Sequence, residues 1–128
     1  MERRQFVGAA ALGLLGSCAQ PLNTKPLNKG IAVDEIYGII GQMKVAEGKR
    51  DQVIAALLKG TRNLPGNILY LIAEDRGDPN SIWITEVWES QSHHAASLQE
   101  PTVREAIAEA QPHITGFGTR VETTPVVS

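Results

Sequence analysis

The chain has 128 residues, 42% of them hydrophobic and 20% charged, a composition typical of one globular domain with a modest core. Its net charge of −2 at pH 7 gives no basic surplus for binding nucleic acid, so no nucleic-acid partner is expected. The single cysteine excludes an intrachain disulfide.

The first 17 residues have the pattern of an export signal. Arg3 and Arg4 resemble a twin-arginine signal, and the apolar run over residues 7–16 is too short to span a bilayer. The Leu-Gly-Ser-Cys sequence that follows resembles a bacterial lipobox, in which Cys18 carries the lipid. The alternative is an amphiphilic helix with an incidental buried cysteine. We expect an exported, membrane-anchored lipoprotein in the periplasm or at the cell surface, which contacts the membrane only through this anchor.

Residues 18–34 are expected to form a flexible tether, because Pro, Asn and Gly recur there without a sustained apolar period. The folded domain is expected over residues 35–123, followed by a short tail, residues 124–128.

The domain begins with a β-rich segment, residues 35–45, whose two glycines allow close approach of a ligand or of backbone. Residues 49–63 carry apolar side chains at helical spacing, and this helix is expected to end near Gly60 as a C-terminal cap. Two strands follow, over residues 67–74 and 82–89, and a hairpin loop rich in turn formers joins them.

Ser90 is expected to cap a helix over residues 91–99, and Pro101 to open a further helix that ends at Pro112. Residues 114–122 form the last expected strand. The order strand, helix, strand, strand, split helix, strand predicts a ferredoxin-like α+β fold, an antiparallel sheet with helices on one face.

Both faces of this sheet are expected to be covered. Alternation along residues 82–89 puts Trp83 on one face and Glu86 and Trp88 on the other, each among aliphatic neighbours. The helices of one subunit cover only one face, and the simplest cover for the other is the sheet of a second copy. We therefore expect a homodimer with a pocket between the sheet and its cover.

Glu86 and His94 are the candidates for proton transfer. Glu86 is a carboxylate among apolar strand residues, which suits general acid–base work; the alternative is a structural Glu paired with a cation or with backbone N–H groups. His94 shares a helix face with Leu98 and is expected to point inward, as a base or a hydrogen-bond donor; the alternative is a structural histidine. His93 is expected to face solvent or a helix edge.

Trp88, Tyr70 and Trp83 are candidates for the walls of a flat pocket for an aromatic ring, although ordinary core packing is the alternative. No metal site is expected, because the histidines match no zinc spacing. Asp75 and Asp78 lie in a loop that lacks the order of a calcium-binding loop and is better explained as a turn. The chain also lacks the signatures of nicotinamide, nucleotide triphosphate and covalent haem binding.

Short motifs occur in a fixed order between about Tyr37 and Phe117. They include Leu64-Pro65-Gly66-Asn67-Ile68-Leu69-Tyr70, Asp78-Pro79-Asn80, Thr85-Glu86-Val87-Trp88-Glu89-Ser90, Val103-Arg104-Glu105-Ala106 and Pro112-His113-Ile114. In this order they resemble the antibiotic biosynthesis monooxygenase (ABM) family, particularly its small quinol-monooxygenase-like members. The resemblance implies dimeric α+β barrels of ferredoxin-like subunits that oxidise quinols or electron-rich aromatics with O₂ and without a cofactor.

The resemblance also assigns roles to residues. Trp88 matches the Trp of the family's Trp-Glu-Ser step, and His94 falls where some members place another polar ring. Arg104 matches the Arg of the Arg-Glu-Ala step and would steady an anionic oxygen. Two departures concern the base: Ile84 stands where some members have Asn, and Ala73 stands near a strand histidine of others. The His and Trp of haem-degrading relatives have no match, so haem degradation is not expected.

We therefore expect a cofactor-independent monooxygenase that oxidises a quinol or a related phenol with O₂. His94 or Glu86 takes the proton, Arg104 holds the oxyanion, and Trp88, Tyr70 and Trp83 form the walls. The alternatives are a non-catalytic lipoprotein that binds a hydrophobic aromatic ligand, and an isomerase on the same scaffold.

Overall fold

The computed structural model describes residues 35–126. In this range the elements are β1 (Tyr37–Val45), α1 (Arg50–Gly60), β2 (Asn67–Glu74), β3 (Ser81–Trp88), α2 (Gln91–Ser97), α3 (Pro101–Ala110), the 3-10 turn η3 (Gln111–His113) and β4 (Ile114–Thr123). The expected export signal, Cys18 and the tether lie outside the described residues. None of the helices in residues 35–126 is both long and apolar enough to cross a membrane.

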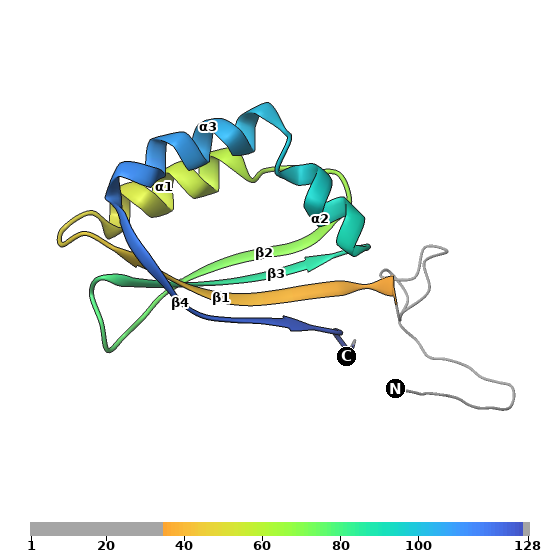
Figure 1. Ribbon diagram of the computed structural model, residues 1–128, viewed down its shortest axis with the longest axis horizontal. Coiled ribbons are helices and arrows are strands. Elements are labelled where there is room, and N and C mark those ends of the chain that lie inside the picture. Colours follow the sequence, from red (N-terminus) through yellow and green to blue (C-terminus); the bar gives the residue numbers. More distant parts are fainter. Residues whose placement is uncertain (1–34, 127–128) are drawn as a thin grey trace, which may run out of the picture. The chain divides into compact units, whose positions relative to one another are not determined.

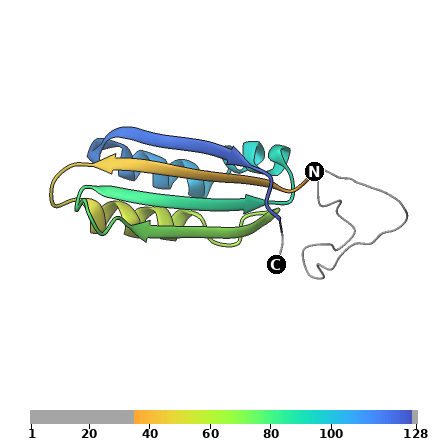
Figure 2. The same cartoon turned by 90° about the horizontal axis from the view of Figure 1, so that it is seen from below.

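The four strands form one antiparallel sheet in the order β2-β3-β1-β4. Figure 1 shows all the helices on one side of the sheet, with α1 and α3 side by side and α2 over one end of the strands. Figure 2, seen from below, shows the strands with no helix in front of them. The predicted ferredoxin-like α+β fold is therefore confirmed.

Helices α1 and α3 approach closely at Gly60. A Cβ at this position would lie 2.4 Å from the Cβ of Ala106 and 2.6 Å from the carbonyl oxygen of Thr102. The helix ends at Gly60 as predicted, but this glycine is needed for helix contact and does not take the left-handed cap conformation. Asn63 (φ 54°) and Gly66 (φ 77°) take that conformation in the turn toward β2.

Helix α2 begins where the sequence predicts because Ser90 caps it. The Ser90 hydroxyl accepts a hydrogen bond from the backbone N–H of His93 at 3.2 Å, which satisfies one of the free N–H groups of the first turn. The His93 ring lies against Gly66, where a Cβ would meet its Cδ2 at 2.3 Å. With His93 held at this helix edge, the next residue, His94, faces the sheet and packs against Trp88.

The helix-facing side of the sheet carries the hydrophobic core. Ile82 of β3 and Val53 of α1 are fully buried in one cluster, against which Tyr70 packs, and Trp88 is fully buried in a second cluster. The alternation predicted for β3 is confirmed, since Glu86 lies on this side with Trp88. Burial of the large side chains under α1 and α3 is what joins the helices to the sheet.

The opposite side of the sheet, which we call the open face, is also apolar. Leu71, Thr85, Ile40 and Val121 are cross-strand neighbours and form one row across all four strands of this face. Leu71 is 51% exposed, Val121 45% and Ile40 37%. A row of aliphatic side chains this exposed is unusual on the surface of a monomeric domain.

Candidate active site

A cavity of about 360 Å³ lies between the sheet and the helices. Its walls are largely aliphatic and include Ile39, Met43, Leu64, Ile84, Val103 and Ile107. This volume is at the lower end of the range for small-molecule sites. Few polar side chains reach the cavity, and each of them can therefore orient a ligand.

Glu86 and His94 meet on one wall of the cavity. The Glu86 side chain is 15% exposed and the His94 side chain 19%. Trp88 donates a hydrogen bond from Nε1 to Glu86 Oε1 at 2.8 Å, and His94 Nε2 lies 3.8 Å from the same oxygen. The Trp88 and His94 rings meet edge to face, with their centroids 5.6 Å apart. Trp88 thus fixes a carboxylate beside an imidazole, and this pair can accept or relay a proton.

Tyr70 stands next to this pair, directly opposite Glu86 on β2. Burial, and after it the negative charge of Glu86, raises the pKa of the Tyr70 hydroxyl far above its usual range. Tyr70 therefore remains a neutral phenol and a potential hydrogen-bond donor within the cavity.

Strand β4 forms one edge of the cavity with Arg120 and Phe117. Phe117 is 74% exposed, which places it at the opening. Arg120 Nη1 lies 3.9 Å from Glu122 Oε2, and the Tyr37 hydroxyl donates a hydrogen bond to the same Glu122 oxygen. Burial, followed by this hydrogen bond, raises the pKa of Tyr37. The opening therefore has a cation, Arg120, whose partner Glu122 also accepts a hydrogen bond from the neutral phenol of Tyr37.

The structure brings together four of the residues that the sequence suggested: Glu86, His94, Trp88 and Tyr70 all line the cavity. Two others lie elsewhere. Trp83 points to the open face, because it is five residues before Trp88 on the same strand and so has the opposite orientation. Arg104 is exposed on α3 and is not among the residues that line the cavity.

Arg120 is the charged residue of the cavity that the sequence interpretation missed; the uncharged polar residues Gln42, Thr61 and Ser97 also line the cavity and were not predicted. It is separated from Ile114 by a stretch with two glycines, and β4 is shifted in register against β1 between Gly41 and Met43. The face on which Arg120 lies is therefore not given by simple alternation from the start of the strand. In the sequence, Arg120 and Glu122 stand two positions apart and therefore share one face of the expected strand. This pair of charged residues was the signal that could have identified Arg120.

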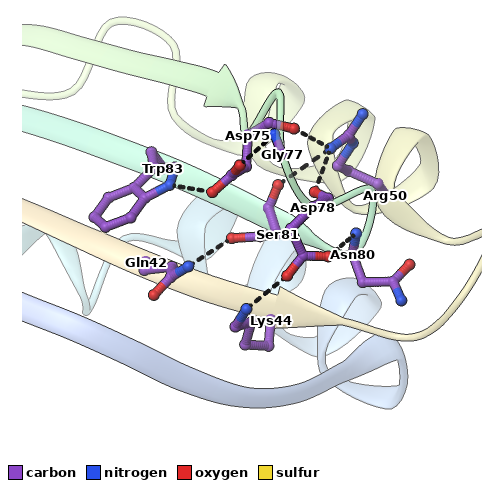
Figure 3. A network of polar contacts seen from close by, with 9 residues as sticks. All are labelled: Gln42, Lys44, Arg50, Asp75, Gly77, Asp78, Asn80, Ser81 and Trp83. Carbon is purple, nitrogen blue, oxygen red and sulfur yellow. Dashed lines mark hydrogen bonds and ion pairs between the residues drawn. The ribbon is translucent and has the colours of Figure 1, made fainter.

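A second polar cluster, which we call the hairpin network, lies at the loop between β2 and β3 (Figure 3). Arg50 Nη1 donates to the carbonyl oxygens of Asp75, Asp78 and Ser81 at 3.1, 3.0 and 3.3 Å. Trp83 Nε1 donates to Asp75 Oδ2 at 2.8 Å. Arg50 thus ties α1 to a turn. Among residues 35–126, no three His, Cys, Asp or Glu side chains gather closely enough to hold a metal ion.

The model of the antibiotic biosynthesis monooxygenase (ABM) family matches residues 36–109. A candidate antibiotic biosynthesis monooxygenase from Chloroflexus aurantiacus is 45% identical to this chain, covers 73% of it and 95% of its own length, and superposes with a TM-score of 0.71. Candidate members from Bacteroides thetaiotaomicron and Caulobacter crescentus are 12% and 17% identical, cover 75% and 73% of this chain and 94% and 92% of their own, and superpose with TM-scores of 0.67 and 0.65. Among curated proteins, no match to the sequence was found.

Proposed function

Because the chain belongs to the antibiotic biosynthesis monooxygenase family, we propose that it oxidises a quinol or a related phenol with O₂ and needs no cofactor to do so. The observation that carries the proposal is the Glu86–His94 pair on the wall of an otherwise aliphatic cavity. Such a cavity excludes water from a bound ring and places a proton acceptor beside it.

The reaction balances without an external reductant. A quinol and one O₂ yield a hydroxyquinone and one water: one oxygen atom forms a new C–O bond on the ring, and the other leaves as water. All four electrons that reduce O₂ come from the quinol. Removal of the hydroxyl proton gives an anion that passes an electron to O₂, so the protein needs to accept that proton and stabilise the anion.

The residues around the Glu86–His94 pair have separate tasks in this reaction. Trp88 holds Glu86 through Oε1, the oxygen nearest to His94, which leaves the second carboxylate oxygen for the substrate hydroxyl. Tyr70 is a neutral phenol beside the carboxylate, and it can donate a hydrogen bond to an oxygen that becomes anionic. The proton taken from the substrate is shared by Glu86 and His94, which act as one pair.

The test is oxygen uptake by the full-length protein over a panel of quinols, in the presence of a chelator. We expect uptake well above autoxidation, and a fall in kcat in both the Glu86→Gln and the His94→Ala variants. Loss in only one variant would identify the base. Tight binding of the same compounds without uptake above autoxidation would overturn the proposal and favour a binding protein.

The homodimer expected from the sequence belongs to the same proposal. The row of Leu71, Ile40 and Val121 on the open face supports it, because pairing with a second sheet would remove these side chains from water. The Leu71→Glu variant should sediment as a monomer. Leu58→Glu, at a similarly exposed position on α1 (48%), is the matched control and should remain dimeric. A monomeric parent protein would contradict this part of the proposal.

A further inference from the structure

The cavity has opposite charges at two places. The Glu86 carboxylate lies on the inner wall, where its side chain is 15% exposed, and the Arg120 guanidinium lies at the edge formed by β4, where its side chain is 55% exposed. Glu86 pairs with Ile39, and Arg120 pairs with Gly41, so the two charged residues stand two strands and two residues apart. This places their Cα atoms about 12 Å from one another. A ligand in the cavity therefore meets a negative group at one end and a positive group at the other.

Gly41 allows the Arg120 side chain to lie over the floor of the cavity. A Cβ at Gly41 would be 4.0 Å from the Arg120 Cγ, and no other side chain lies within that distance. The Arg120 stem thus passes over the strand position that has no side chain, and both residues line the cavity. An alanine Cβ would make ordinary contact here, whereas a longer side chain at position 41 would compete with Arg120 for this space.

Within residues 35–126 the Arg120 guanidinium has a long ion pair with Glu122, and it also interacts with the Tyr37 hydroxyl, where it counteracts the rise in pKa that burial causes. Its ion pair with Glu122 is 3.9 Å long, and the same Glu122 oxygen already accepts the hydrogen bond from Tyr37. A guanidinium has five N–H donors in a planar fork that fits a carboxylate. Arg120 can therefore bind a second carboxylate at the opening of the cavity while its contact with Glu122 persists.

On these grounds, and resting on the proposed function, we propose that the substrate is a phenol or quinol that carries an acidic substituent, which Arg120 binds at the opening of the cavity. The acid group lies on Arg120 because the carboxylate of Glu86 would repel it from the inner wall. The hydroxyl that loses its proton then faces Glu86 and His94. Arg120 in this way sets both the class of substrate and its orientation. The family match ends at residue 109, so it does not assign this residue.

The test compares a dihydroxynaphthoic acid with its carboxamide, which has the same shape and no charge. Binding to the full-length protein is measured by calorimetry without oxygen, so that it does not depend on turnover. We expect the acid to bind about tenfold more tightly than the carboxamide, as for a charge-assisted pair that is partly exposed. The Arg120→Gln variant should lose this preference and bind the carboxamide as the parent does. Arg76→Gln, an exposed arginine of the hairpin loop, is the matched control and should keep the preference.

Equal binding of acid and carboxamide by the parent protein, or an acid preference that persists in Arg120→Gln, would overturn the proposal. The Glu122→Gln variant gives an independent check: removal of this carboxylate should tighten binding of the acid alone. Oxygen uptake is then measured with the same two probes. An intact acid preference without uptake on either probe would support the Arg120 site and contradict the oxidation, which separates the two proposals.

Discussion

The two tryptophans of strand β3 each donate to a carboxylate, and the two Trp–carboxylate pairs are alike in chemistry and differ in surroundings. Trp83 donates to Asp75 and Trp88 donates to Glu86, each through Nε1 at 2.8 Å. The two tryptophans are five residues apart, so they lie on opposite faces of the sheet. Asp75 also accepts a bond from the backbone N–H of Gly77 at 2.8 Å, in the exposed hairpin network.

The two pairs differ in whether a carboxylate oxygen remains free to bind a ligand. In the hairpin network each Asp75 oxygen already has a donor, and these bonds, Trp83 first and Gly77 second, lower the pKa of Asp75. The pair therefore fixes a turn. In the cavity, Trp88 occupies one oxygen of Glu86, and Nε2 of His94 is 3.8 Å from that oxygen. A Trp–carboxylate contact does not by itself indicate a site; incomplete pairing beside a cavity does.

The largest expected effect comes from removing each indole. Trp88 is fully buried, so Trp88→Ala should lower the free energy of unfolding by about 3–5 kcal/mol through the cavity it creates. Trp83 is only half-buried, and Trp83→Ala should cost less than half as much in the monomeric Leu71→Glu background, which removes any effect of a dimer. Urea denaturation of both variants measures the difference. Equal losses would mean that the two faces of β3 are equally buried.

Converting each carboxylate to an amide tests whether the two Trp–carboxylate pairs differ in their contribution to kcat. An amide oxygen still accepts the indole hydrogen bond but is a far weaker base, so Glu86→Gln should lower kcat for quinol oxidation by about 100-fold or more. Asp75→Asn should leave kcat unchanged. Oxygen uptake at saturating substrate gives both values. A similar fall in both variants would point to a general effect on folding.

The sequence predicted strand β3 and the faces of its residues well, because period-2 alternation assigns the faces of a strand this regular. It also predicted the Ser90 cap, which depends on local chemistry and sets the orientation of His94. Alternation also put Trp83 on the face opposite Glu86 and Trp88, and the structure agrees; it was the grouping of Trp83 with the pocket walls that ignored this face assignment. The sequence failed at Arg120, because the register shift against β1 breaks the alternation and because long-range pairing is not encoded locally.

Arg50 supports the turn that holds the Trp83–Asp75 pair. Its replacement should lower stability without lowering catalytic activity. Arg50→Met would leave the three carbonyl oxygens that it binds without that donor, and the side chain is 19% exposed. We expect a loss of about 1–3 kcal/mol in the free energy of unfolding. The ratio of kcat to KM should stay within twofold of the parent, since Arg50 does not line the cavity. A large fall in that ratio would show that the two clusters are coupled.

The smallest expected effect is a pH dependence that distinguishes two aspartates within the hairpin network. The pKa of Asp75 is lowered mainly by the Trp83 hydrogen bond, and that of Asp78 mainly by Lys44, whose Nζ lies 2.7 Å from Asp78 Oδ2. A pKa below the unfolded value, about 3.9, means that each group stabilises the fold above that pH. This stabilisation is lost as pH falls through the lower, folded pKa.

The stability differences between parent and Asp75→Asn, and between parent and Asp78→Asn, should therefore be present at pH 7 and shrink near pH 3. Salt separates their causes, since 1 M salt screens an exposed ion pair more than a hydrogen bond to an indole. At pH 7 the Asp78→Asn difference should decrease in 1 M salt, whereas the Asp75→Asn difference should persist. Denaturant titrations at 0.1 and 1 M salt measure both. If the Asp75→Asn difference also disappeared in salt, its stabilisation would come from net charge, and the Trp83–Asp75 bond would not be the structural counterpart of the Trp88–Glu86 bond.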